Sequence, residues 1–129
     1  RNLLIPGGYT ACDIRKMSNK LKRTKRVNYS IYPMVESRSE MAAIEEIAST
    51  EFVRGFHFGL YDLSNDLDIQ NWRDHNVWQE QLSTVIHTIK SHGKKCGSYF
   101  LPEWEQSEYS RQLDVKSYSI DELCKLNSD

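Results

Sequence analysis

Short apolar runs alternate with amphipathic segments along the chain, and this alternation is the feature that most restricts the fold. Runs that suit buried strands cover residues 2–5, 27–35, 53–60, 95–101 and 115–119. Apolar residues recur at helical spacing in 13–21, 37–48, 77–92, 104–113 and 119–126. A regular β-α order with short connections predicts an α/β fold with a parallel sheet and right-handed crossovers.

Polar and glycine residues mark the expected ends of the helices. Ser37 and Glu40, and again Ser119 and Glu122, have the spacing of a capping box at a helix N-terminus. Gly93 follows the longest amphipathic segment and is typical of a left-handed C-cap. The segment 72–76 is expected to be a loop.

Five β-α units are too few to close a barrel of the TIM type. Such a barrel has eight strands and about 250 residues, whereas this chain has 129. We therefore expect one domain over residues 1–129, forming either an open sheet or a partial barrel, with two unpaired edges. A homo-oligomer, or completion by another chain, would cover those edges. Because the first residue is Arg1 rather than Met, we also expect that upstream sequence has been removed.

Charge and cysteine usage narrow the classes of partner. Seventeen Lys and Arg residues oppose 18 Asp and Glu residues, and this balance argues against nucleic-acid binding. No stretch approaches the ~20 apolar residues of a membrane-spanning helix, and no signal peptide is visible. The three cysteines are far apart and odd in number, which fits free thiols in a reducing compartment. We expect a cytoplasmic protein without nucleic-acid or membrane partners.

Two carboxylates follow neighbouring predicted strands. Glu36 comes after the run 27–35, and Asp62 comes after the run 53–60. Functional groups of parallel α/β folds gather at the carboxyl ends of the strands, and adjacent strands lie about 4.8 Å apart. The two side chains can therefore converge on a divalent ion such as Mg²⁺ or Mn²⁺. From spacing alone, the simpler interpretation is that each carboxylate only caps a helix or a turn, because Asp and Glu are common at such positions.

The residues around these carboxylates resemble a known family. The segments Ile31-Tyr32-Pro33-Met34-Val35-Glu36-Ser37 and Gly55-Phe56-His57-Phe58-Gly59-Leu60-Tyr61-Asp62-Leu63-Ser64 are similar to two strand ends of the HpcH/HpaI aldolase and citrate lyase beta-subunit superfamily. The resemblance extends over nearly the whole chain and corresponds to strands four to eight of a TIM-type barrel.

The resemblance implies a metal-dependent carbon–carbon lyase. Glu36 and Asp62 would hold Mg²⁺ or Mn²⁺, and the backbone of Gly59, Leu60 and Tyr61 would approach the substrate carboxylate. The substrate would be a 2-oxo acid or an acyl-CoA compound, and the reaction would pass through a metal-stabilised enolate. The family's substrate-clamping Arg and its His–Asp pair lie on strands with no counterpart here, so no residue is assigned to either role.

The missing clamp leaves a second interpretation open. The chain could be a non-catalytic remnant or interaction module of the same fold. A nucleotide-binding α/β domain is disfavoured, because no Gly-rich phosphate motif follows the first strand. His57 is expected to face the interior, and Glu103 and Glu105 are weaker candidates for the rim of the site.

Overall fold

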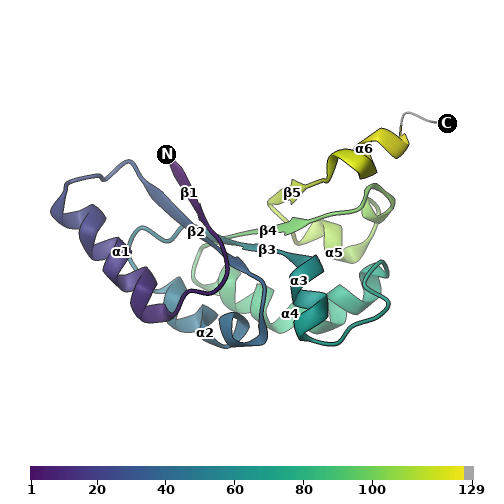
Figure 1. The fold of residues 1–129 in the computed structure, drawn as a ribbon, viewed down its shortest axis with the longest axis horizontal. Helices are drawn as coiled ribbons and strands as arrows, with labels where there is room; N and C mark the ends of the chain where they lie inside the picture. The colour runs from purple at the N-terminus through teal and green to yellow at the C-terminus, as the bar shows by residue number, and fades with distance from the viewer. Residues whose placement is uncertain (127–129) are drawn as a thin grey trace.

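The sheet has five parallel strands in the order β1-β2-β3-β4-β5, so each strand pairs with the next one in the chain. The computed structural model describes residues 1–126. Its strands are β1 (Asn2–Ile5), β2 (Ser30–Val35), β3 (Gly55–Phe58), β4 (Lys95–Tyr99) and β5 (Val115–Ser117). The sheet curls into half of a barrel (Figure 1). The predicted α/β class and parallel order are therefore confirmed.

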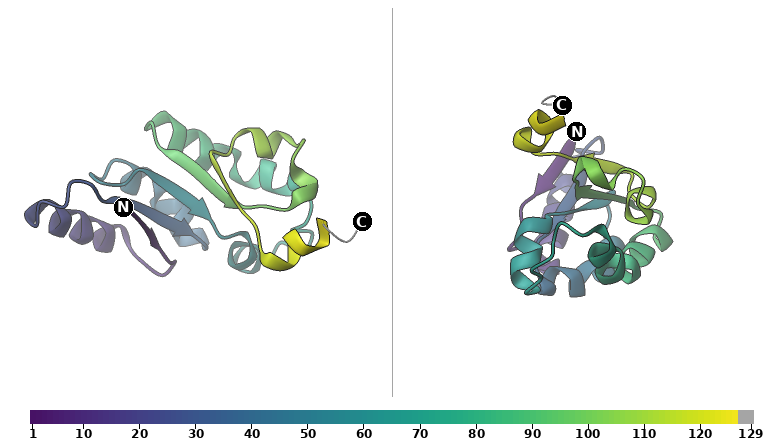
Figure 2. Two further views of the ribbon diagram at one scale, coloured as in Figure 1. Left: turned by 90° about the horizontal axis from the view of Figure 1, so that it is seen from above. Right: turned by 90° about the vertical axis from the view of Figure 1, so that its right-hand side faces the viewer.

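The helices that link consecutive strands form a layer on the outer face of the sheet, and a last helix follows β5. They are α1 (Ala11–Arg23), α2 (Arg38–Ala48), α3 (Leu60–Asp66), α4 (His75–Ser91), α5 (Glu108–Arg111) and α6 (Ile120–Leu126), with a 3₁₀ turn, η1 (Pro102–Trp104). Along this layer α1 contacts α2, α2 contacts α4, and α4 contacts α5. Figure 2 shows these helices following the curve of the sheet. None of the helices in residues 1–126 has the length and apolar character needed to cross a bilayer.

The core lies between the sheet and the outer helices. In β2, Ile31 and Val35 are buried on the helix side, whereas Tyr32 and Met34 lie on the inner side and are only half-buried. Ile44 of α2 and Trp78 of α4 are also buried against this outer face. Burial of each such apolar side chain contributes about 1.5–3 kcal/mol to folding. The period-two pattern of the strands therefore fixes which face carries the helices.

Several boundaries differ from those predicted. The strand predicted from residue 27 begins at Ser30, because Lys25 has φ 55° and the Tyr29 N–H donates to the Arg26 carbonyl in a turn. The strand predicted to reach residue 60 ends at Phe58 and is followed directly by α3, which the pattern did not predict. The segment 104–113 is split into η1 and α5 rather than forming one helix. Gly93 has φ 69°, as expected for a left-handed C-cap.

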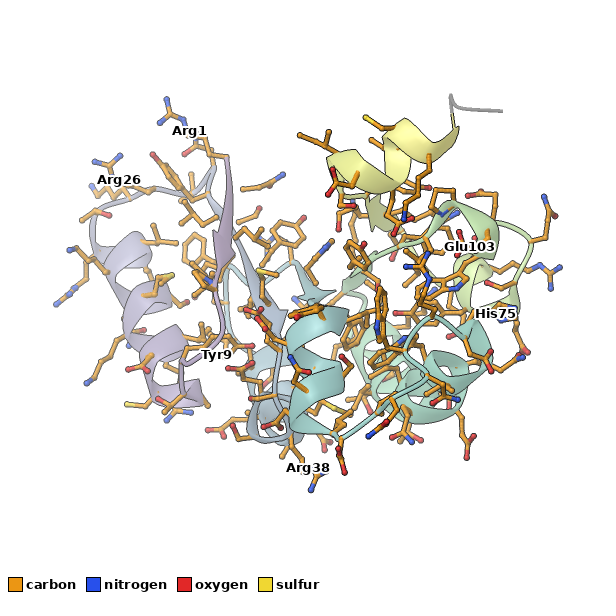
Figure 3. The ribbon with its side chains drawn as sticks, turned by 45° about the vertical axis from the view of Figure 1, so that its right-hand side comes forward. Arg1, Tyr9, Arg26, Arg38, His75 and Glu103 are labelled. Carbon is orange, nitrogen blue, oxygen red and sulfur yellow. The ribbon has the colours of Figure 1, made fainter. Side chains whose placement is uncertain are left out.

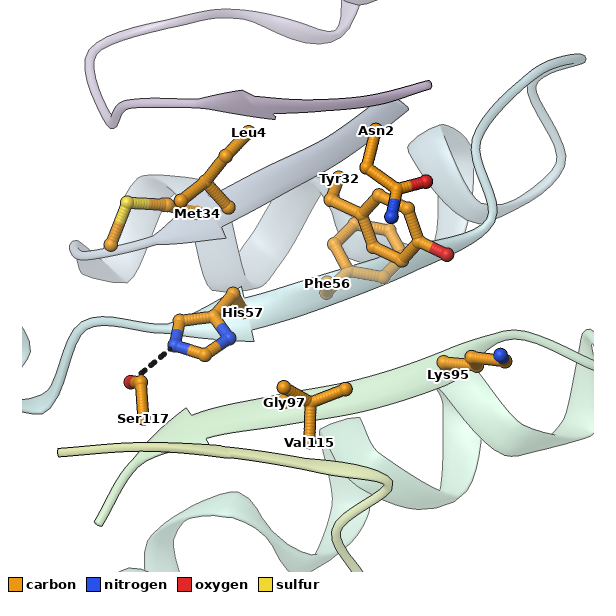
Figure 4. A pocket seen from close by; sticks show the side chains of 10 residues that line it. All are labelled: Asn2, Leu4, Tyr32, Met34, Phe56, His57, Lys95, Gly97, Val115 and Ser117. Carbon is orange, nitrogen blue, oxygen red and sulfur yellow. Dashed lines mark hydrogen bonds between the residues drawn. The ribbon is translucent and has the colours of Figure 1, made fainter. Parts of the chain in front are cut away.

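The inner face of the half-barrel is open. A cavity of about 480 Å³ lies over it, lined by residues from all five strands (Figure 4). Leu4 on β1 and Val115 on β5 line its two edges, and they are 55% and 49% exposed. In a closed barrel such side chains fill the interior. The sheet thus presents an apolar inner surface and two unpaired edges.

Candidate active site

The carboxyl ends of β1, β2 and β3 border an open cavity of about 510 Å³. Its lining comes from the segment after β1, the start of α2 and the start of α3, and includes Gly7, Gly8, Tyr9, Glu36, Glu40 and Asp62. Glu36 directly follows β2, and Asp62 lies in the first turn of α3. The structure therefore brings the two predicted carboxylates to one cavity.

The Glu36 side chain is held between two glycines. The Gly7 N–H donates to Oε1 of Glu36 at 2.8 Å. On the other side, a Cβ atom at Gly59 would lie 2.9 Å from Cγ and 3.0 Å from Oε2 of Glu36. A side chain at position 59 would therefore meet Glu36 directly. The absence of a Cβ atom at Gly59 lets Glu36 pass between β2 and the start of α3.

Negative charge is concentrated around Glu36. Burial is the largest cause that raises the pKa of this carboxyl, and the Gly7 N–H opposes it. A hydrogen bond and repulsion from Asp62, and then repulsion from Glu40, raise the pKa of Glu36 further. A carboxylate beside like charges gains stability from a nearby cation, because the cation favours the ionised form. The site is therefore suited to a positively charged ligand.

Glu40 belongs to this site, although sequence analysis placed it only in a capping box. Half of that box is present, since Ser37 Oγ accepts from the Glu40 N–H at 3.3 Å. The Glu40 side chain, however, accepts from the backbone N–H groups of Glu36 and Gly8. The capping pattern predicts a bond to Ser37 itself. Only the fold of the loop after β1 brings Gly8 within reach, so the sequence carried no signal for this contact.

Tyr9 is a second residue that sequence analysis missed. Its hydroxyl donates to the Met34 carbonyl at 2.8 Å. Burial and the negative charges of Glu40 and Glu36 raise the pKa of Tyr9 well above its usual value. Tyr9 therefore keeps the proton that it donates to the Met34 carbonyl, and it lines the cavity as a neutral side chain beside the carboxylates. It is labelled in Figure 3, on the segment that follows β1.

The three residues expected near the substrate have different surroundings. The Gly59 N–H donates to the Val35 carbonyl at 3.0 Å, so this group is already used within the sheet. The Leu60 side chain is fully buried and can offer only its backbone. Tyr61 is 66% exposed, next to Asp62. Gly59 thus gives space to Glu36, while Leu60 and Tyr61 begin α3 just before Asp62, which is the residue of this helix that lines the cavity.

The donor set fits a divalent ion that keeps part of its water shell. In the described part of the chain, no group of three or more His, Cys, Asp or Glu side chains is arranged to hold a metal. Glu40 is turned toward backbone N–H groups, which leaves Glu36 and Asp62 as the two oxygen donors. Mg²⁺ sites commonly use one or two carboxylates together with water and substrate oxygens. Glu36 and Asp62 together meet that requirement.

The remaining sequence candidates lie away from these carboxylates. His57 faces the inner cavity, as expected, and its Nε2 lies 2.8 Å from Ser117 Oγ (Figure 4). Burial lowers the pKa of His57, which favours a neutral ring. Glu103 pairs with Arg73 and Glu105 pairs with Lys116, each at 3.1 Å. These ion pairs account for both glutamates without a role at the rim of the site.

A curled parallel sheet with helices on its outer face defines part of a (β/α) barrel, and comparison with solved structures gives the same result. An HpcH/HpaI aldolase/citrate lyase family protein from Burkholderia cenocepacia superposes with a TM-score of 0.77 at 16% identity, over 99% of this chain and 62% of that one. Citrate synthase SbnG gives 0.75 at 16% identity, over 98% and 59%.

A third similar structure is the citrate lyase beta subunit from M. tuberculosis, complexed with oxaloacetate and magnesium. Its TM-score is 0.67 at 15% identity, over 91% of this chain and 55% of that one. The chain thus spans less than two thirds of each of these proteins. No family model and no curated protein sequence matches. The resemblance to this superfamily is therefore confirmed in the fold.

Proposed function

We propose that the chain is part of a metal-dependent carbon–carbon lyase, with Mg²⁺ or Mn²⁺ held by Glu36 and Asp62. The observation that carries this proposal is the meeting of these two carboxylates at one cavity, beyond the carboxyl ends of β2 and β3. Repulsion from Asp62 is one of the causes that raise the pKa of Glu36, and a bound cation would relieve that repulsion. The fold shared with aldolase and citrate lyase structures supports a lyase-like reaction.

The proposed substrate is a 2-oxo acid or an acyl-CoA compound. A divalent ion held by Glu36 and Asp62 would supply Lewis-acid chemistry at a substrate carbonyl. The chain would contribute the orientation of Glu36 through Gly7, and Tyr9, whose hydroxyl is bonded to the Met34 carbonyl, would form a neutral wall of the cavity. The backbone of Leu60 and Tyr61 would lie nearest the substrate carboxylate, with Gly59 leaving the space that Glu36 occupies.

We also propose that further strands cover the open inner face, from a second copy or from another chain. The charge distribution favours a second copy. Eight of the 17 Lys and Arg residues precede Ser30, but only one of the 18 Asp and Glu residues does. Figure 3 shows Arg1 and Arg26 on one side of the molecule and Glu103 on the other. Residues 100–126, around β5, carry six Asp and Glu residues against three Lys and Arg residues. The basic end of one copy could therefore meet this acidic end of a second copy.

The compartment is part of the same proposal. Cys12, Cys96 and Cys124 are all free thiols. Burial raises the pKa of Cys96 to about 12, so that this thiol stays protonated and unreactive. Free thiols suit a reducing environment, and we propose the cytoplasm.

Metal binding by the chain tests the central proposal. We expect the wild type to bind Mn²⁺, measured by electron paramagnetic resonance of the free ion, and Glu36→Ala and Asp62→Ala each to abolish that binding. Circular dichroism should show that both variants remain folded. Glu45→Ala is the matched control, because Glu45 is an exposed carboxylate on α2. Mn²⁺ binding that survives both site substitutions would overturn the assignment.

A lyase assay then tests the substrate class. Carbon–carbon bond cleavage would be followed with a panel of 2-oxo acids and acyl-CoA esters, with and without Mn²⁺. Activity that requires Mn²⁺ and is lost with Asp62→Ala is the expected result. Metal binding without cleavage of any member of the panel would instead indicate a non-catalytic module of this fold.

A further inference from the structure

Glu40 is a buried carboxylate whose partners are backbone groups rather than a cationic side chain. It is only 3% exposed. Its Oε1 accepts from the Glu36 N–H at 2.8 Å, and its Oε2 accepts from the Gly8 N–H. Burying a charge beside another carboxylate is costly, because the buried group loses its hydration and also meets a like charge. Glu40 therefore needs an explanation beyond the helix cap that Ser37 already supplies.

The contacts of Glu40 form a closed ring with those of Glu36. Glu40 holds the backbone of Glu36 and the backbone of Gly8. The neighbouring Gly7 N–H in turn donates to the Glu36 carboxylate at 2.8 Å. A Cβ atom at Gly7 would lie 3.0 Å from Oε1 of Glu36 and from both oxygens of Glu40. The loop after β1 is thus seated directly on both carboxylates.

We propose that Glu40 is a positioning residue that orients Glu36 for cation binding. Glu40 fixes the backbone of Glu36, and by holding Gly8 it fixes the neighbouring Gly7 N–H, which donates to the Glu36 carboxylate. Glu40 also adds negative charge to the cavity without acting as a ligand. This inference rests on the proposed metal site of Glu36 and Asp62. It places a third carboxylate, Glu40 in the first turn of α2, among the groups that support that site. Groups that orient metal ligands in this way typically affect metal affinity by 10–100-fold.

The test compares Glu40→Gln with Glu45→Gln, two charge-neutralising changes on the same helix. We expect Glu40→Gln to weaken Mn²⁺ binding by about 10–100-fold and Glu45→Gln to leave it unchanged. Glu40→Ala should weaken binding more than Glu40→Gln, because Gln keeps one acceptor oxygen. A residue that only stabilised the fold would lower the melting temperature and leave the Mn²⁺ affinity of the folded fraction unchanged.

Amide hydrogen exchange gives a readout that needs no metal. Glu40→Gln should speed exchange at Gly8 and Glu36, whose N–H groups lose a charged acceptor. If the wild type binds Mn²⁺ and Glu40→Gln binds it equally well, the inference is overturned while the proposed function stands. If the wild type does not bind Mn²⁺, the proposed function is overturned and the inference with it.

Discussion

Replacing Gly59 with Ala should disable the proposed metal site and leave the fold intact. Gly59 has φ −90° and ψ 87°, a conformation that alanine can adopt, so the backbone is not strained. The new Cβ atom would lie 2.9 Å from Cγ of Glu36. Carbon atoms prefer separations of about 3.5–4.0 Å, so Glu36 must move by roughly 1 Å. Metal–ligand distances tolerate only about 0.2 Å, and the displaced carboxylate no longer fits.

The expected cost in stability is small because a flexible side chain absorbs the clash. Overpacking typically costs about 1–3 kcal/mol, while Gly→Ala at a permitted conformation returns about 0.4–1 kcal/mol through the unfolded state. The free energy of unfolding should therefore stay within about 1–2 kcal/mol of the wild type. The affinity for Mn²⁺ should fall by at least about tenfold. Urea denaturation and Mn²⁺ titration measure these two quantities separately.

Gly93 provides a control with the opposite outcome. It has φ 69°, and a Cβ atom added there would have no other atom within 4 Å. Gly93→Ala should lose about 1–2 kcal/mol to left-handed strain and keep Mn²⁺ binding unchanged. Wild-type Mn²⁺ affinity in Gly59→Ala would refute the reasoning, because it would mean that Glu36 is not confined by Gly59 or is not a ligand.

Three further predictions concern stability and assembly. Burial lowers the pKa of His57 below its usual value of 6.5. The contribution of the neutral ring to stability is therefore fully present above pH 6.5 and is lost as the pH falls through the lowered pKa. Thermal denaturation at pH 5 and pH 7 should show a smaller acid-induced loss for His57→Gln than for the wild type, and an equal loss would contradict this. Trp78 is fully buried and its Nε1–H donates to the Trp72 carbonyl at 2.7 Å, so Trp78→Ala should lower the free energy of unfolding by about 3–5 kcal/mol in urea. Light scattering should show a defined oligomer that weakens at high salt, since opposite charges at the two sheet edges are screened. A monomer at all salt concentrations would contradict the second-copy proposal.

The alternation of apolar and amphipathic segments was sufficient to predict the layered parallel fold. Each strand run has its own helix partner in sequence, so pairing needs no long-range information. The third strand shows a limit of this prediction, because its end was placed two residues too late. The apolar run continues through Leu60, but the chain turns into α3 after Phe58. Leu60 is buried at the start of that helix, and an apolar run looks the same in a buried strand and a buried helix turn.

The candidate site was predictable only where strand ends determine it. Glu36 and Asp62 follow adjacent strands, and sheet geometry brings them together. Glu40 and Tyr9 enter the site through the path of the loop after β1, which no periodicity encodes. The capping-box pattern already explained a glutamate at position 40, so it gave no reason to place Glu40 in the site. Local signals therefore found the ends of the elements, and tertiary contacts decided which nearby side chains join the site.

The sequential strand order has a consequence for how the chain is made. Every strand pairs with the strand that precedes it, so each new β-α unit finds its partner already synthesised. Contacts between neighbouring units close short loops, which keeps the entropic cost of each step low. The sheet can therefore grow from β1 toward β5 while translation continues. During that growth the newest strand presents an unpaired edge to the next unit, and in the described sheet β5 still has such an edge, with Val115 49% exposed.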